Sequence, residues 1–173
     1  YREIRSVREE RVFFEKMAYT DAMTGANNRA RYIKDVENFP AKNGVVVVQA
    51  DTDRLKYIND SFGHFAGDRA IIDTYEVLNK NFAHIGKVYR AGGDEFTAII
   101  ENTDKETINA IVEEVRKEVS LIDKEREYDF SISMGMAEYD ASLDKDLYST
   151  ALRADKEMYE DKKRLRDKLT DKG

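Results

Sequence analysis

Apolar residues recur along this chain at two spacings, and each spacing predicts a different kind of element. Where they return every three or four residues, one helix face is apolar and the other polar. Where they alternate or run without interruption, a strand is favoured. The helical spacing predicts helices over residues 1–20, 29–38, 71–82, 108–119 and 147–165.

The strand pattern is clearest in the four consecutive valines of residues 45–48. A continuous β-branched run of this kind predicts a central strand that is buried on both faces. Two further strand-like runs, 87–91 and 95–101, flank the glycine-containing segment 92–94, and this arrangement is typical of a hairpin.

A last strand with one buried face is predicted by the alternation of Phe130, Ile132 and Met134. Helices and strands interleave along the chain, but the hairpin breaks a strict βαβ order. We therefore predict an α+β fold in which helices cover a mixed, largely antiparallel sheet of about five strands.

The first predicted helix carries an imperfect heptad pattern, in which Arg11 takes one seam position. The apolar residues of this pattern are Ile4, Val7, Phe14 and Ala18. Two interpretations stay open: an amphipathic helix that packs on its own domain, or the end of a coiled coil arriving from upstream. We divide the chain into an N-terminal helix, 1–20, and a domain, 21–173. Because it begins at Tyr1 rather than Met, we expect a piece of a longer protein.

Composition restricts the chemistry that is available. The chain has no cysteine and only two histidines, which disfavours disulfides and zinc sites. A metal site must then be built from oxygen ligands, which favours magnesium, calcium or manganese. A formal net charge of −6 disfavours nucleic acid as a partner. No apolar run reaches the roughly 20 residues that span a bilayer, and no signal peptide is visible.

Four carboxylates stand at positions that a sheet would bring together. Asp51 and Asp53 end the valine-rich strand, and Asp94 and Glu95 lie at the tip of the hairpin. If the hairpin pairs beside that strand, their mutual repulsion favours a divalent cation, which can polarise a phosphoryl oxygen. The alternatives are that Asp53 caps the helix that follows it and that the hairpin tip is only a turn.

Two further pairs could contact a nucleotide, although no Walker loop, dinucleotide fingerprint or EF-hand loop is present. Lys162 and Arg166 are four residues apart on a helix, so they share a face and could clamp phosphate. Asn59 and Asp68 offer an amide and a carboxylate, which suit the edge of guanine. The alternatives are a solvated basic stripe for the first pair and helix-end and turn residues for the second.

Four motifs, occurring together and in order, resemble the GGDEF family of diguanylate cyclases over roughly residues 20–167. They are Asp21-Ala22-Met23-Thr24-Gly25 with Asn28-Arg29, the segment from Asp51-Thr52-Asp53 to Gly67-Asp68, Ala91-Gly92-Gly93-Asp94-Glu95-Phe96, and the segment from Ala154-Asp155 to Arg166. The resemblance implies a fold like the palm of nucleotidyl cyclases and polymerases. It also makes 1–20 a signalling helix and 21–173 the catalytic domain.

The resemblance implies a role for each motif residue. The implied metal ligands for Mg²⁺ (or Mn²⁺) are Asp51, Asp94 and the backbone carbonyl of Thr52. The implied substrate-binding residues are Asn59 and Asp68 for guanine, and Lys56, Lys162 and Arg166 with the backbone around Arg54 and Leu55 for the triphosphate. The implied catalytic residues are Asp94, Glu95, Lys162 and Arg166, with Glu95 supporting the metal shell or the attacking hydroxyl.

The implied activity condenses two GTP into cyclic di-GMP plus two pyrophosphates across a facing homodimer. The implied partners are GTP, a second copy of the domain and an upstream sensor. The expected location is the cytoplasm, with a membrane anchor elsewhere in the full-length protein left open. The alternative function is a degenerate GGDEF module that binds GTP and signals without catalysis. The sequence also leaves open a cyclic di-GMP receptor and a cyclase for another nucleotide.

One segment departs from the family pattern. Many relatives carry an Arg-x-x-Asp product-binding motif that starts nine residues before the first signature glycine. Ala83 and Gly86 occupy the Arg and Asp places here. We therefore expect that the usual feedback site is missing, which also disfavours a function as a cyclic di-GMP receptor.

Overall fold

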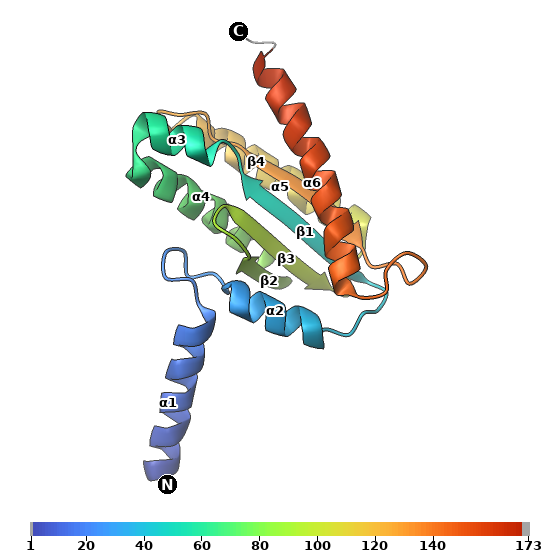
Figure 1. The fold of residues 1–173 in the computed structure, drawn as a ribbon. Coiled ribbons are helices and arrows are strands. Elements are labelled where there is room, and N and C mark those ends of the chain that lie inside the picture. Colours follow the sequence, from blue (N-terminus) through green and yellow to red (C-terminus); the bar gives the residue numbers. More distant parts are fainter. Residues whose placement is uncertain (1, 171–173) are drawn as a thin grey trace.

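The computed structural model describes residues 2–170 as four antiparallel strands and the helices that cover them (Figure 1). Tyr1 and residues 171–173, at the outer ends of the two predicted domains, lie outside the described residues. The strand order is β2 (Gly86–Arg90), β3 (Glu95–Glu101), β1 (Val45–Thr52) and β4 (Ile132–Glu138). The predicted α+β class is confirmed. Within 2–170 the sheet has four strands, and all their pairings are antiparallel rather than mixed.

The central strand β1 is buried on both faces, as the run of valines predicts. Its residues Val46, Val48 and Ala50 lie in one hydrophobic cluster, and Val45 and Val47 lie in another. The first cluster joins the sheet to α4 (His64–Phe82) and α5 (Lys105–Asp123), and the second joins it to α2 (Arg29–Asn38) and α6 (Leu147–Thr170). The helices therefore form a layer on each side of the sheet (Figure 1).

Helix α6 crosses β4 at very close range. A Cβ atom added to Gly135 in β4 would overlap the backbone nitrogen of Met158 and the carbonyl oxygen of Ala154, both in α6. Only a residue without a side chain allows this approach. The contact fixes α6 against the sheet one turn before Lys162, and so fixes the position of that side chain.

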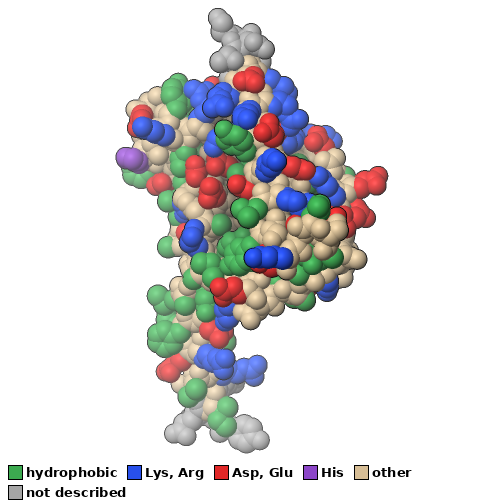
Figure 2. Space-filling view, turned by 45° about the vertical axis from the view of Figure 1, so that its right-hand side comes forward, with side chains coloured by type: hydrophobic (Ala, Val, Ile, Leu, Met, Phe, Trp, Pro, Cys, Tyr) green, Lys and Arg blue, Asp and Glu red, His purple; other side chains and the backbone are tan. Residues whose placement is uncertain are grey.

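Helix α1 (Arg2–Tyr19) projects from the body of the domain (Figure 1). Most of its apolar side chains are solvent-exposed, with Ile4, Val7 and Phe14 at 74%, 66% and 66% of full exposure (Figure 2). The interpretation that this helix packs along its own domain is therefore wrong. The coiled-coil interpretation stays a prediction. None of the helices in residues 2–170 has the length and apolar character needed to cross a bilayer.

Asp144 anchors the loop before α6 and gives a stability prediction. Its buried carboxylate accepts hydrogen bonds from Arg153 Nε (2.8 Å), Thr150 Oγ1 (2.9 Å) and the Asp140 backbone nitrogen (3.0 Å). The bond from Arg153 is the main cause that lowers the Asp144 pKa from 3.8 to about 2. This contribution to stability is complete above about pH 4 and is lost as the pH falls toward 2.

Asp144→Asn is expected to lower the free energy of unfolding by about 2–3 kcal/mol at pH 7, and the difference from wild type should shrink below pH 4. Urea unfolding of both proteins, at pH 7 and below pH 4, measures this difference. Asp146→Asn is the matched control, because Asp146 accepts from the Ser149 backbone nitrogen (2.9 Å) at the helix start and Asn caps equally well. An equal loss in both variants would contradict the prediction.

Candidate functional site

The end of β1 and the hairpin tip meet at one edge of the sheet. Asp51 pairs with Glu95 across β1 and β3, and the Thr52 backbone nitrogen donates to the carbonyl oxygen of Asp94 at 3.0 Å. The hairpin thus pairs beside the valine-rich strand, which is the condition under which the sequence brings these acids together. It places Asp51, Thr52 and Asp94 next to one another.

The carboxylate of Asp51 lies in an environment with excess negative charge. Its pKa is raised to about 6, mainly by burial; the nearby charges of Asp94 and Asp53 also raise it, and Lys162 lowers it. Lys162 Nζ donates to Asp51 Oδ1 at 3.0 Å. A buried carboxylate with a second acid beside it is a site where a hard cation would relieve repulsion.

The donor set fits an oxygen-ligated divalent ion. The Thr52 hydroxyl is hydrogen-bonded with the Thr74 hydroxyl at 2.8 Å inside the domain, so only the Thr52 backbone is available as a ligand. Among residues 2–170, no group of three or more acidic, histidine or cysteine side chains gathers at one point. The predicted site needs only the carboxylates of Asp51 and Asp94 with one carbonyl, so its assignment stays a prediction.

Asp53 has a different role from the helix cap that the sequence allowed. Its carboxylate accepts hydrogen bonds from Ser131 Oγ at 2.7 Å and Ser133 Oγ at 2.5 Å. Helix α3 (Leu55–Phe62) instead begins after Arg54, which has φ 55° and makes no side-chain cap bond. Asp53 therefore ties the end of β1 to the start of β4, and burial raises its pKa.

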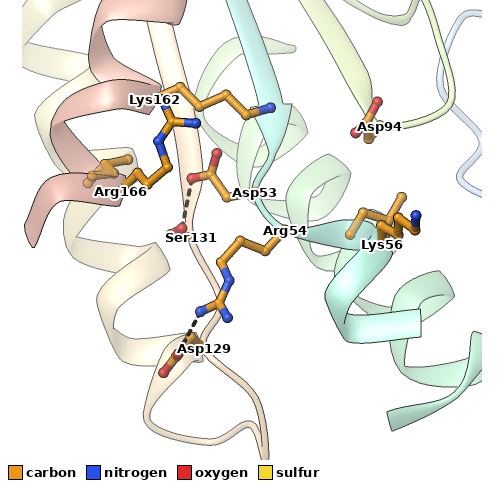
Figure 3. Close-up of a pocket in the computed structure, with 10 residues that line it drawn as sticks. Asp53, Arg54, Lys56, Asp94, Asp129, Ser131, Lys162 and Arg166 are labelled. Carbon is orange, nitrogen blue, oxygen red and sulfur yellow. Dashed lines mark hydrogen bonds and ion pairs between the residues drawn. The ribbon is translucent and has the colours of Figure 1, made fainter. Parts of the chain in front are cut away.

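A cavity of about 680 Å³ opens beside these acids (Figure 3). Its volume is in the range of small-molecule sites. The lining residues that the sequence predicted are Arg54, Leu55, Lys56, Asp94, Lys162 and Arg166. Sequence reasoning missed Asp129 and Ser131, which also line the cavity. They lie in the segment that leads into β4, and the local sequence gives no sign that it adjoins the end of β1.

Basic side chains reach the cavity from two directions. Lys162 and Arg166 come from α6, and Lys56 comes from α3 on the other side (Figure 3). The solvated-stripe interpretation is wrong for Lys162, because that side chain contacts buried Asp51. The structure therefore surrounds one space with positive charge, while Asp94 and Asp53 supply negative charge to its wall.

The remaining predicted residues lie outside this cavity. Asn59 in α3 lies directly over Gly67 in α4, where an added Cβ would overlap its amide, so the corner of these helices brings Asn59 close to Asp68. Glu95 is exposed and lines a second cavity of about 170 Å³ with Gln49 and other residues. The residues predicted for guanine therefore do not line the large cavity.

Arg90 holds the hairpin tip in place, a role that sequence reasoning did not find. Its guanidinium donates to the carbonyl oxygen of Gly93 from Nη2 at 2.7 Å and to Asp21 Oδ2 from Nη1 at 3.0 Å. The turn that follows α1 is thereby connected to the residue before Asp94. Its neighbour Ala91 accepts a hydrogen bond from Arg29 Nη1 at 3.2 Å.

Comparison with known proteins identifies similar sequences. A family model described as "Diguanylate cyclase, GGDEF domain" matches residues 18–168. Probable diguanylate cyclase DgcI of Escherichia coli is 35% identical over 99 residues, which cover 57% of this chain and 22% of DgcI. Diguanylate cyclase DgcM of the same organism is 29% identical over 128 residues, covering 71% of this chain and 31% of DgcM. The chain thus spans less than a third of these two relatives.

Similar folds occur in solved structures. The coiled coil and GGDEF domain of DgcB from Caulobacter crescentus, in complex with c-di-GMP, matches with a TM-score of 0.80 and 25% identity. That match covers 93% of this chain and 89% of the DgcB chain, so the likeness extends over the sheet and its helices.

Proposed function

This chain belongs to the GGDEF domain family of diguanylate cyclases, and we propose that it condenses two molecules of GTP into cyclic di-GMP and two pyrophosphates. The observation that supports this most is the convergence of Asp51, Thr52 and Asp94 beside a cavity lined by Lys56, Lys162 and Arg166. Paired carboxylates and cations around one space suit a triphosphate bound with a divalent ion.

In the proposed mechanism the protein positions two reactants and neutralises charge. The carboxylates of Asp51 and Asp94 and the Thr52 carbonyl would hold Mg²⁺ (or Mn²⁺), which when bound neutralises charge on the phosphates. Lys56, Lys162 and Arg166 would bind the triphosphate. The 3′-hydroxyl of one GTP then attacks the α-phosphate of the other, and pyrophosphate leaves.

The reaction needs a second copy of the domain, since each copy binds one GTP and supplies one attacking hydroxyl. Glu95, exposed on the side of the second cavity, would support the metal shell or the hydroxyl that attacks. We further propose that the domain works in the cytoplasm under the control of an upstream sensor.

Incubating the protein with GTP and Mg²⁺ and identifying the product by mass spectrometry tests the proposal. Cyclic di-GMP is the expected product. Bound GTP without product, at high protein concentration, would instead identify a degenerate module that signals without catalysis. A cyclic mononucleotide would identify another kind of cyclase.

Base selection gives a prediction for Asp68. Asp68→Ala is expected to weaken GTP binding by about 5- to 100-fold and ATP binding much less, because a guanine donor loses its acceptor. Asp60→Ala is the matched control, because Asp60 is an exposed acid in the neighbouring helix α3. Titration calorimetry with both nucleotides measures the effect. An equal loss for GTP and ATP would mean that Asp68 is structural.

Another prediction concerns feedback inhibition by the product. Ala83 is the C-cap of α4 and Gly86 begins β2, so neither position offers the bidentate phosphate contacts of an arginine or a carboxylate acceptor. A Cβ at Gly86 would also overlap the carbonyl oxygen of Ile99 in β3. Added cyclic di-GMP is expected to inhibit only weakly and by competition with GTP. Tight, non-competitive inhibition mapped to residues 83–86 would contradict this expectation.

A further inference from the structure

Arg54 lies in the wall of the large cavity with its charge turned away from Asp94 (Figure 3). Its Nη1 donates to Asp129 Oδ2 at 3.0 Å, and its guanidinium lies 4.2 Å from the ring centroid of Tyr57. The pair is solvent-exposed, with Arg54 and Asp129 side chains at 37% and 67% of full exposure. An ion pair in water contributes little to stability, so a better anion can displace the carboxylate.

We propose that Arg54 exchanges Asp129 for the triphosphate of the bound nucleotide, and that Asp129 is a positioning residue that sets the affinity of the site. This inference rests on the proposed function, because it takes the cavity to be the triphosphate site. The phosphate offers two oxygens to a planar guanidinium, and such bidentate bonds are stronger than an exposed pair with a carboxylate.

The geometry limits the movement to the two side chains. The backbone on which they stand is held together by the bond from the Asp53 backbone nitrogen to the Ser131 carbonyl oxygen, at 3.0 Å, and by the bonds from Ser131 and Ser133 to the Asp53 carboxylate. Arg54 and Asp129 therefore stay opposite each other while the guanidinium swings. In the position that the structure shows, the guanidinium lies over the Tyr57 ring, which leaves its edge available to bond an anion.

Asp129 also explains why this cavity is not simply a basic pocket. Its carboxylate stands on the cavity wall and competes with phosphate for Arg54. Nucleotide binding must break the pair, so the pair weakens binding without touching the reacting atoms. Its removal should lower KM for GTP and leave kcat unchanged, as expected for uniform binding.

The test measures triphosphate affinity apart from turnover. Inorganic tripolyphosphate with Mg²⁺ is titrated calorimetrically into wild type, Asp129→Asn, Arg54→Gln and the double variant, and KM and kcat for GTP are measured in parallel. Gln is chosen because it removes the charge of Arg54 and, like Arg, has a Cβ at the positive φ of this position. The matched control is Glu127→Gln, which removes an exposed acid two residues from Asp129.

Asp129→Asn is expected to tighten tripolyphosphate binding by about two- to fivefold, to lower KM for GTP equally, and to have no effect in the Arg54→Gln background. If Asp129→Asn tightened tripolyphosphate binding equally with and without Arg54, the effect would be general charge repulsion and the exchange would be overturned. Equal tightening by Glu127→Gln would have the same meaning. Unchanged binding in Asp129→Asn would overturn it as well. Tightened tripolyphosphate binding without cyclic di-GMP formation from GTP would overturn the proposed function and leave the exchange standing.

Discussion

Asp94→Asn is expected to lower the rate of cyclic di-GMP formation by at least about a thousandfold, which corresponds to roughly 4 kcal/mol of lost transition-state stabilisation. The carboxylate is one of two that would hold the ion, and an amide does not replace its charge. Asp94 holds the β1 strand through its backbone carbonyl, which the substitution keeps. The fold should therefore survive.

The unfolding temperature of Asp94→Asn shows whether activity is lost through the metal site or through loss of the fold. Asp94 is one of the charges that raise the pKa of Asp51, so the metal-free variant should unfold at the same temperature as wild type or a higher one. Glu101→Gln is the matched control, because it removes an exposed acid from the far end of β3, the strand that begins directly after Asp94. Near wild-type product formation by Asp94→Asn would contradict the assignment of Asp94 as a metal ligand.

The second large effect concerns assembly. Specific activity is expected to rise with protein concentration, because one domain holds only half of the reactants. A strong parallel dimeric coiled coil fused in register ahead of Tyr1 should raise the rate at micromolar protein by about a hundredfold through effective concentration. The exposed apolar side chains of α1 form a seam that the fused coiled coil can extend. Because Arg11 interrupts this seam, α1 alone should dimerise poorly.

The matched control is the same fusion shifted by two residues, which turns the domains away from each other and should lower the rate again. Initial rate per domain is measured against concentration for all three proteins, with ultracentrifugation to report assembly. A rate per domain that stays constant, in a protein that is monomeric throughout, would exclude catalysis between facing domains.

Local sequence patterns were sufficient where an element is defined by its own residues. The valines of 45–48 form a strand buried on both faces, and the segments on either side of 92–94 pair as a hairpin. The pairing of that hairpin with the central strand then brought Asp51 and Asp94 together. These features follow from side-chain periodicity and turn chemistry, which act over a few residues.

Features that depend on distant segments could not be predicted. Asp53 accepts hydrogen bonds from Ser131 and Ser133, which lie 78 and 80 positions further along the chain, and nothing near Asp53 distinguishes this arrangement from a helix cap. The pairing of Arg54 with Asp129 has the same origin. The sequence shows Gly135 only as a glycine within a strand. The crossing of α6 over β4 explains why a side chain is excluded there.

The packing of Gly86 also bears on any attempt to build a feedback site into this chain. A Cβ at this position would overlap the carbonyl oxygen of Ile99 in the neighbouring strand β3, so an aspartate here needs a local shift of the backbone. Ala83 would still lack the arginine. Building an Arg-x-x-Asp motif therefore requires a change in the packing of β2 on β3 as well as the two substitutions.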